Sequence, residues 1–371
     1  MDYRKKRIII SILTITLLLP VVTYAKPDNA ISTLAKSAIA IDNNTGRVLY
    51  GHNVDDRMPM ASVTKIMTAI IAIEKCNMND YVKIGVNSTY VGGSSLWLKS
   101  GEKIRMIDLL YGLMLKSGND ASVAISEYIS GSTKSFVEMM NNKANQLGLY
   151  DTHFANPHGL DIDIDDHYTT ARDLALLTRY ALKNPLFKKI VATKYKTISN
   201  EKHNQIRQLK NHNKMLWLYD GVYGVKTGYT KKAGRCLVTA CNKKGLDITV
   251  VTLNCPDDWK ETSTILDYIY KNYTPKTVFN KGAILKYINV NSSSTNLIIE
   301  RDIVIPMKKN EKLIYSILSI DTIDAPVKKG DVLGTLYIYN GNLKFPLIAQ
   351  KTVNKGNFVE KVINILYNKL L

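Results

Sequence analysis

The chain has 371 residues, of which 45% are hydrophobic, so it can bury a sizeable core, and two domains are a better expectation than one. Its 50 basic and 32 acidic residues give a formal net charge of +18. The four cysteines form no CxxC pair and have no histidine at metal-ligand spacing, so no metal site is indicated and free thiols are expected.

The N-terminus has the pattern of a targeting segment. Basic residues from Arg4 to Arg7 precede an apolar run from Ile8 to Val22 and a small residue, Ala25. This order predicts a secretory signal peptide over residues 1–25. An uncleaved anchor is the alternative, but the run is shorter than the roughly 20 residues that a span needs. Export argues against nucleic acid as a partner. The basic mature chain suits an anionic cell envelope, although a lysine-rich solvated surface explains the charge equally well.

The next part of the chain alternates between strand and helix patterns. Residues 38–42 and 47–51 flank Asn43-Asn44-Thr45-Gly46, which predicts a β-hairpin. Apolar residues recur at helical spacing after Ser62 and after Asp108. Further helices are predicted at 119–148, 171–183 and 261–272, and further strands at 222–226, 235–241 and 247–253. This order predicts an α+β domain over residues 26–274, in which helices pack on an antiparallel sheet.

The pattern changes after Thr274-Pro275. Short alternating runs at 283–290, 297–305 and 332–339 predict a small all-β domain over residues 275–353. Helical spacing returns at 354–371, where apolar and polar residues separate onto two faces. The apolar face consists of Phe358, Val359, Val362, Ile363, Leu366 and Leu370. We expect an amphipathic helix that lies in a membrane surface or, alternatively, packs on its own protein, because no apolar run is long enough to span.

A nucleophile and a base are predicted at Ser62-Val63-Thr64-Lys65, where a hydroxyl and an amine three residues apart share one helix face. A serine hydroxyl needs an adjacent base, and a lysine can serve if burial and nearby positive charge lower its pKa. The spacing alone is weak evidence, since Ser199 and Lys202 show it too without a helix pattern around them.

Two further triplets strengthen this interpretation. Ser117-Gly118-Asn119 follows the predicted helix that begins near Asp108, and Lys226-Thr227-Gly228 ends a predicted strand. Ser-x-x-Lys, Ser-x-Asn and Lys-Thr-Gly in this order are typical of penicillin-binding proteins and β-lactamases.

With these motifs the chain resembles the low-molecular-mass penicillin-binding proteins, the D-alanyl-D-alanine carboxypeptidases of peptidase family S11. The resemblance covers nearly all of the chain after the N-terminal segment. It includes Gly93-Ser94-Ser95, Asn156-Pro157-His158-Gly159-Leu160-Asp161 and Tyr168-Thr169-Thr170-Ala171-Arg172-Asp173. The segment Asp257-Asp258-Trp259 is most similar to members from spore-forming Gram-positive bacteria.

The resemblance implies a penicillin-binding-protein and β-lactamase-like fold. It also implies an enzyme that removes the terminal D-alanine from peptidoglycan stem pentapeptides and is acylated by β-lactams. Ser62 would attack the carbonyl between the two terminal D-alanines, with Lys65 as its base. Ser117 and Lys226 would relay a proton to the leaving amine. The enzyme would act at the outer face of the cytoplasmic membrane, in the cell wall space.

The substrate-binding residues follow from the same resemblance. Asn119 would hold the substrate backbone, and Lys226 with Thr227 would bind its terminal carboxylate. The backbone amides of Ser62 and Tyr229 would form an oxyanion hole. The strand that carries Lys226, Thr227 and Gly228 would accept the peptide as an added strand at a sheet edge. No cofactor is implied.

Two positions depart from the family pattern and leave carboxylate binding open in detail. His212 stands where many members have arginine, and Tyr229 stands where some have histidine. A histidine near the carboxylate would change its charge between about pH 5 and 8. For His158, packing within its own loop is preferred over a role in the site. Three other functions remain possible: an endopeptidase of peptidoglycan cross-links, a β-lactamase, and a non-catalytic wall-binding protein.

Overall fold

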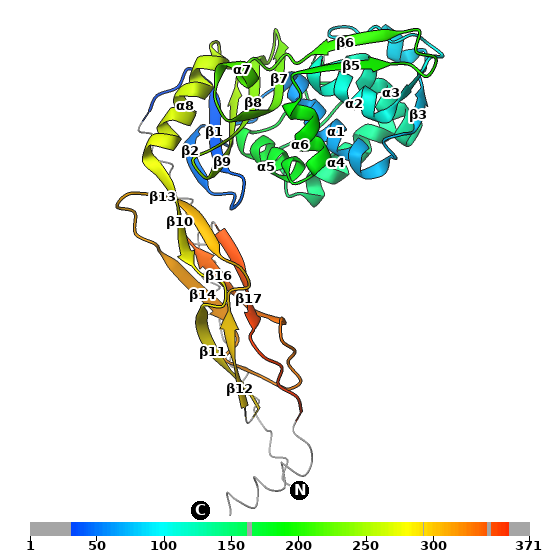
Figure 1. The fold of residues 1–371 in the computed structure, drawn as a ribbon. Coiled ribbons are helices and arrows are strands. Elements are labelled where there is room, and N and C mark those ends of the chain that lie inside the picture. The colour runs from blue at the N-terminus through cyan, green and yellow to red at the C-terminus, as the bar shows by residue number, and fades with distance from the viewer. Residues whose placement is uncertain (1–30, 162–164, 292, 340–342, 356–371) are drawn as a thin grey trace, which may run out of the picture.

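The computed structural model describes residues 31–161, 165–291, 293–339 and 343–355. Figure 1 shows a broad α+β part, which contains strands β1 and β2 and the helices, and an elongated all-β part that extends away from it. The order of elements confirms the predicted α+β fold class. In the α+β part, two strands come first in the sequence, a mainly helical stretch follows, and three further strands come after it.

A five-stranded sheet forms the centre of the α+β part. Its strands are β1 (Ser37–Asp42), β2 (Val48–His52), β7 (Val222–Thr230), β8 (Gly234–Lys243) and β9 (Leu246–Leu253). Their order is β2-β1-β9-β8-β7, and all neighbours are antiparallel. β7 is therefore an edge strand, and it continues through the Lys226-Thr227-Gly228 triplet instead of ending there.

Helices cover both faces of this sheet, as the alternation of side chains along β1 shows. Ile39 and Ile41 belong to the larger core, which they share with most of the helices. Ala38 and Ala40 belong to a second core, which they share with the C-terminal helix of this part. That helix is α8 (Asp258–Asn272), and the other face carries α1 (Lys65–Lys75), α2 (Met106–Leu115), α3 (Asn119–Ser130), α4 (Thr133–Gln146), α5 (Ala171–Leu182) and α6 (Pro185–Ala192).

Some predicted boundaries were wrong. The helix expected at 119–148 is two helices, because Gly131 ends α3 in the left-handed conformation and Ser132 caps α4 through a hydrogen bond from the Ser135 amide. Helix α6 and two short two-stranded sheets were not predicted at all. Those strands are β3 (Tyr81–Lys83) with β4 (Lys103–Arg105), and β5 (Tyr195–Ser199) with β6 (Ile206–Lys210).

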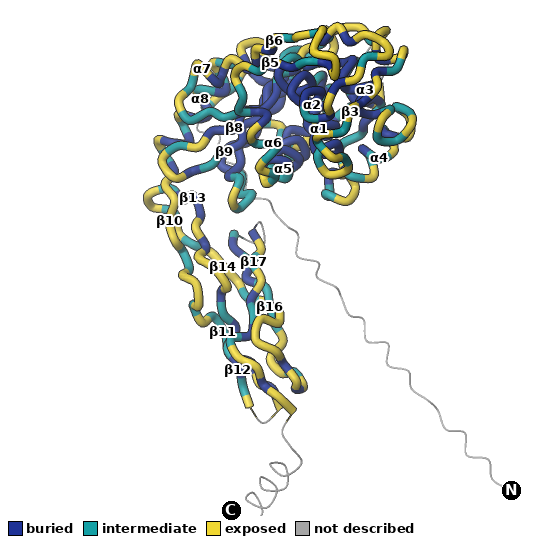
Figure 2. The backbone as a smooth tube through the Cα atoms, turned by 45° about the vertical axis from the view of Figure 1, so that its right-hand side comes forward, coloured by how far each residue is buried: buried dark blue, intermediate teal, exposed yellow. Residues whose placement is uncertain are grey.

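The all-β part contains two sheets around a smaller core. β10 (Tyr273–Phe279) pairs with β13 (Ile303–Lys308). The six-stranded sheet has the order β14-β16-β17-β12-β11-β15. Its strands are β11 (Ile284–Val290), β12 (Ser293–Ile298), β14 (Tyr315–Ser319), β15 (Thr322–Ile323), β16 (Val332–Ile338) and β17 (Leu343–Ala349). Figure 2 shows buried residues concentrated in the α+β part, whereas much of the all-β part is exposed.

One arginine joins the two parts. Arg47, just before β2, donates hydrogen bonds to the Pro306 carbonyl and to the Tyr339 hydroxyl, and it forms an ion pair with Glu311. Its guanidinium also lies 4.2 Å from the centre of the Tyr339 ring. The side chains of this ion pair are mostly buried, so the contact fixes the orientation of the two parts more firmly than a surface ion pair would.

The predicted signal peptide lies outside the described residues, and so does most of the predicted C-terminal helix. Within the described ranges, no helix combines the length and the apolar character that crossing a bilayer requires. The four cysteines are all free, and three of them are buried in agreement with the sequence expectation, while Cys76 is partly exposed.

Candidate active site

The first motif lies where a short helical turn leads into α1. Ser62 belongs to a 3-10 turn (Ala61–Thr64), and Lys65 is the first residue of α1. Ala61 has a positive φ of 49°, a conformation that is uncommon for a residue with a side chain and often marks a functional turn. The structure confirms that the two side chains meet, since Nζ of Lys65 lies 2.9 Å from Oγ of Ser62.

Lys65 is completely buried, and its three hydrogen-bond partners are all oxygen atoms. Besides Oγ of Ser62, its Nζ contacts Oδ1 of Asn119 at 2.7 Å and the carbonyl oxygen of His158 at 2.6 Å. Burial, followed by the positive charge of Lys226, holds the pKa of Lys65 well below its usual value. A neutral amine beside a serine hydroxyl can accept its proton, so the pair has the arrangement of a base and its nucleophile.

The second motif occupies the short connection between α2 and α3. Ser117 has a positive φ of 61°, and its hydroxyl is buried without a hydrogen-bond partner among the described residues. Buried hydroxyls normally have a partner, so this one is available to a bound molecule. Asn119 begins α3, and its amide nitrogen donates to the Gly92 carbonyl at 2.6 Å, which leaves its oxygen directed at Lys65.

The third motif lies on the edge strand β7. Lys226 is buried, its Nζ donates to the Thr227 carbonyl at 2.8 Å, and burial lowers its pKa to about 7. Gly228 allows β7 to approach the serine closely, because a Cβ atom there would lie only 3.0 Å from the Ser62 nitrogen. Tyr229 follows with 68% of its surface exposed. The edge strand therefore runs directly beside the nucleophile.

His212 lies near Lys226, but its pKa differs from the value expected from the sequence. Its side chain is exposed, and its backbone nitrogen donates to the Leu115 carbonyl at 2.9 Å. Partial removal from solvent, followed by the charges of Lys116 and Lys226, lowers the pKa of His212 to about 4. This value lies below the range of pH 5 to 8 in which the change of charge was expected, because partial burial, which the sequence does not show, disfavours the charged imidazole.

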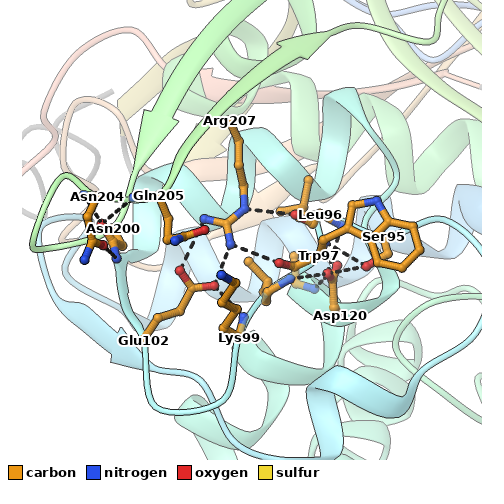
Figure 3. Close-up of polar contacts among 12 residues, drawn as sticks. Ser95, Leu96, Trp97, Lys99, Glu102, Asp120, Asn200, Asn204, Gln205 and Arg207 are labelled. Atoms are coloured by element: carbon orange, nitrogen blue, oxygen red, sulfur yellow. Dashed lines mark hydrogen bonds and ion pairs between the residues drawn. The ribbon is translucent and has the colours of Figure 1, made fainter.

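Asp120, which the sequence did not single out, stabilises the loop beside the second motif. Its Oδ2 accepts hydrogen bonds from Oγ of Ser95 at 2.6 Å, from the Leu96 nitrogen at 2.8 Å and from the Leu98 nitrogen at 3.2 Å (Figure 3). The Asn119 nitrogen donates to the Ser94 carbonyl in the same loop at 2.7 Å. The acidic residue in the first turn of α3 was a readable signal, since carboxylates stabilise helix N-termini.

Arg207 on β6 holds the same loop from the other side (Figure 3). Its guanidinium donates to the Leu96 carbonyl at 2.9 Å and to the Trp97 carbonyl at 3.1 Å, and it forms a mostly buried ion pair with Glu102 at 2.6 Å. No sequence signal indicated this contact, because it joins a hairpin that was not predicted to a loop about a hundred residues earlier.

His158 contributes its backbone to the site and uses its side chain within its own loop. Its carbonyl accepts the hydrogen bond from Lys65, whereas its Nδ1 accepts from the Leu160 nitrogen at 3.2 Å. Burial, followed by the charge of Lys65, lowers the pKa of His158 to about 3. The neutral imidazole agrees with the expected packing role.

Comparisons with known proteins agree with the motifs. Residues 22–257 match the peptidase S11 family, described as D-alanyl-D-alanine carboxypeptidase, and residues 273–355 match the C-terminal domain of penicillin-binding protein 5. D-alanyl-D-alanine carboxypeptidase DacF of Bacillus subtilis is 33% identical over 342 residues, which cover 88% of this chain and 87% of that protein. DacA of Escherichia coli is 32% identical over 364 residues, which cover 91% and 87%.

Solved structures show the same similarity. Penicillin binding protein 5 from Haemophilus influenzae has a TM-score of 0.75 at 26% identity and covers 88% of this chain and 100% of its own. The D-alanyl-D-alanine carboxypeptidase DacD from Francisella tularensis has a TM-score of 0.67 at 27% identity, with coverages of 90% and 96%.

Proposed function

Since the chain belongs to the D-alanyl-D-alanine carboxypeptidase family, peptidase S11, we propose that Ser62 is the nucleophile of a serine carboxypeptidase reaction. Its hydroxyl attacks the carbonyl between the two terminal D-alanines of a peptidoglycan stem peptide. The terminal D-alanine leaves with a proton on its amine, and water then hydrolyses the acyl-enzyme. The endopeptidase alternative uses the same chemistry on a cross-link.

The observation that carries this proposal is the contact between Ser62 and Lys65. A buried amine with a lowered pKa lies 2.9 Å from the serine hydroxyl, so it can be neutral and accept the hydroxyl proton as the new ester bond forms. The other two Lys65 contacts, to Asn119 and His158, hold the amine in this position.

The leaving amine needs a proton, and in this proposal Ser117 supplies it. Its unpartnered buried hydroxyl supports a role as the group that passes the proton, with Lys226 as the neighbouring cation. Lys226 and Thr227 would also bind the terminal carboxylate. Asn119 would hold the peptide backbone.

Edge strand β7 is suited to bind the stem peptide as an added strand, because its outer hydrogen-bonding groups face no neighbouring strand of the sheet. The amides of Ser62 and Tyr229 would then form the oxyanion hole, which the close approach of Gly228 to Ser62 supports. His212 would contact the same end of the substrate as a neutral side chain.

A labelling experiment tests this assignment. A fluorescent penicillin should form one covalent adduct, which peptide mass analysis places on Ser62, and Ser62→Ala should abolish both the adduct and the release of D-alanine. The matched control is Ser199→Ala, which changes the other Ser-x-x-Lys sequence, at the end of strand β5. An adduct that persists in Ser62→Ala would refute the assignment.

Product analysis separates the alternatives. Loss of one D-alanine from a wall pentapeptide indicates a carboxypeptidase, and cleavage of a cross-linked dimer indicates an endopeptidase. Rapid turnover of penicillin would indicate a β-lactamase, and no adduct at all would indicate a non-catalytic wall-binding protein.

Export and membrane attachment complete the proposal. The first 25 residues would direct secretion, and residues 354–371 would lie in the outer surface of the cytoplasmic membrane as an amphipathic helix. The elongated all-β part supports this arrangement, because it would act as a spacer that holds the Ser62 site toward the wall (Figure 1).

A further inference from the structure

A series of buried hydrogen bonds links Ala155 and His167 to the turn that carries Ser62. Oγ1 of Thr64 lies 2.7 Å from the Ala61 carbonyl oxygen and 2.8 Å from Nε2 of His167. Nδ1 of His167 in turn accepts from the Ala155 nitrogen at 3.0 Å. Thr64 and His167 are both buried, and the mechanism proposed above uses neither of them.

The donor and the acceptor of each hydrogen bond in this series can be assigned. A backbone N–H can only donate, so Nδ1 of His167 is an acceptor and its neutral imidazole carries the proton on Nε2. Burial, followed by the charge of His153, lowers the pKa of His167 to about 4, which keeps the ring neutral at physiological pH. Nε2 therefore donates to Thr64, and the Thr64 hydroxyl is left to donate to the Ala61 carbonyl.

This carbonyl belongs to the same peptide unit as the Ser62 N–H. A peptide unit is planar and trans, so its C=O and N–H point in opposite directions and cannot turn independently. Ala61 has a positive φ, which gives this peptide its unusual direction. A hydrogen bond that fixes the Ala61 oxygen therefore also fixes the direction of the Ser62 N–H.

Two glycines enclose the same peptide unit. A Cβ at Gly159 would lie 1.9 Å from the Ala61 oxygen and 2.8 Å from Oγ1 of Thr64, and one at Gly228 would lie 3.0 Å from the Ser62 nitrogen. The backbone at Gly159 thus lies close to the oxygen of this peptide unit, and the backbone at Gly228 lies close to its nitrogen. The Thr64 hydroxyl adds a directional hydrogen bond to the oxygen.

We propose that His167 and Thr64 are positioning residues that aim the Ser62 N–H at the oxyanion formed during acylation and deacylation. The inference rests on the proposed function, because it concerns the same carbonyl that Ser62 attacks. Neither residue touches the substrate. They act by holding the Ala61 carbonyl, and they keep the amide in place before the negative charge develops.

The test compares two substitutions of Thr64. Thr64→Val keeps the shape of the side chain but removes the hydroxyl, whereas Thr64→Ser keeps the hydroxyl. Loss of an oxyanion donor costs about 10²–10³ in rate, and a misaimed donor should cost less. We expect acylation of Thr64→Val by penicillin to be about tenfold to a hundredfold slower, with unchanged non-covalent affinity, and Thr64→Ser to stay within about threefold of the original rate.

A spectroscopic measurement separates aiming from general stability. In the penicilloyl adduct of Thr64→Val, the infrared band of the ester carbonyl should move to higher frequency, since its hydrogen bond from Ser62 is weakened. His167→Leu should shift the band in the same direction. Thermal unfolding of each variant establishes that it is folded at the assay temperature.

The possible failures are distinguishable. If the unchanged protein forms no adduct, the proposed function itself fails. If the unchanged protein is acylated and Thr64→Val matches it in acylation rate and carbonyl frequency, only the positioning role is overturned. Equal losses in Thr64→Ser and Thr64→Val would also overturn it, because the hydroxyl would then not be the cause.

Discussion

Burial, followed by the positive charge of Lys226, lowers the pKa of Lys65, and both lysine side chains are buried in the same site. In the proposed mechanism, these two lysines have different roles. Lys65 is poised to be a neutral base beside Ser62, while Lys226 retains enough basicity, with a pKa of about 7, to be a cation for the substrate carboxylate. Burying both must lower the stability of the folded protein, since an ammonium loses its hydration there.

The first prediction is that Lys226→Met stabilises the protein in a pH-dependent way. An unfolded lysine has a pKa of about 10.4, and that of Lys226 falls to about 7 in the folded protein. The unfolded state therefore binds more protons between these values, so the destabilisation by Lys226 is largest below about pH 7 and decreases toward pH 10. Urea unfolding at pH 6 should show a gain on the order of 2–4 kcal/mol, with a smaller gain at pH 9.

Lys231→Met is the matched control, because Lys231 is exposed and its ammonium keeps its hydration in the folded state. It should give no comparable gain at either pH. A gain for Lys226→Met that is the same at pH 6 and pH 9 would contradict the argument from burial of the charge.

The second prediction concerns Asp120, whose two carboxylate oxygens accept hydrogen bonds from Oγ of Ser95 and from backbone nitrogens, including that of Ala121. In Asp120→Asn, either orientation of the amide places its NH₂ group against a donor. We expect a loss of about 2–4 kcal/mol in the free energy of unfolding, measured with urea.

The same substitution should alter the pH dependence of acylation. The charge of Asp120 raises the pKa of Lys65, so its removal should move the acidic limb of the acylation profile to lower pH. Asp165→Asn is the control, because Asp165 is exposed and its ion pair with Lys232 is a surface contact that contributes little. An unchanged profile in a folded Asp120→Asn protein would show that this charge does not act on the base.

The third prediction is that Arg47→Ala loosens the two parts of the molecule without affecting the active site. The substitution removes the contacts to Pro306, Glu311 and Tyr339. Small-angle X-ray scattering should then show a broader distribution of distances, while the rate of penicillin acylation stays the same. Arg57→Ala, which removes an exposed ion pair to Asp151, should leave the scattering unchanged. If both variants give identical scattering, contacts other than those of Arg47 hold the two parts in their orientation.

How far the sequence could predict this structure depends on the range of the contacts. Ser62 and Lys65 are three residues apart, so local geometry alone predicted their meeting. The strands at 38–42 and 247–253 were recognisable because most of their residues are apolar on both faces, as burial on both faces of the central sheet requires. The edge position of β7 was expected from the resemblance and is confirmed.

The missed features depend on partners that are distant in the sequence. Within strands β5 and β6, only Ile198 and Leu209 are buried, while Tyr195 and Ile206 are exposed, so these strands lack a clear apolar face. The partners of Arg207 and His167 are likewise set by tertiary packing. No local pattern identifies a histidine whose neighbour is Thr64, about a hundred residues earlier.

The last prediction concerns the segment after the all-β part, which lies outside the described residues. Val353 is buried in the core of that part and pairs with Val327 through both of its backbone groups, so a truncation should keep it. Removing residues 356–371 should release the protein from vesicles that contain anionic lipid and leave penicillin acylation unchanged. The apolar face of an interfacial helix enters the lipid whereas its polar face does not, so Val362→Asp should weaken binding far more than Asn364→Asp, which adds the same charge on the other face. Vesicle sedimentation measures both effects. If the truncated protein still sediments with vesicles, the segment is not the anchor, and if truncation instead lowers the unfolding temperature markedly, the helix packs on its own protein.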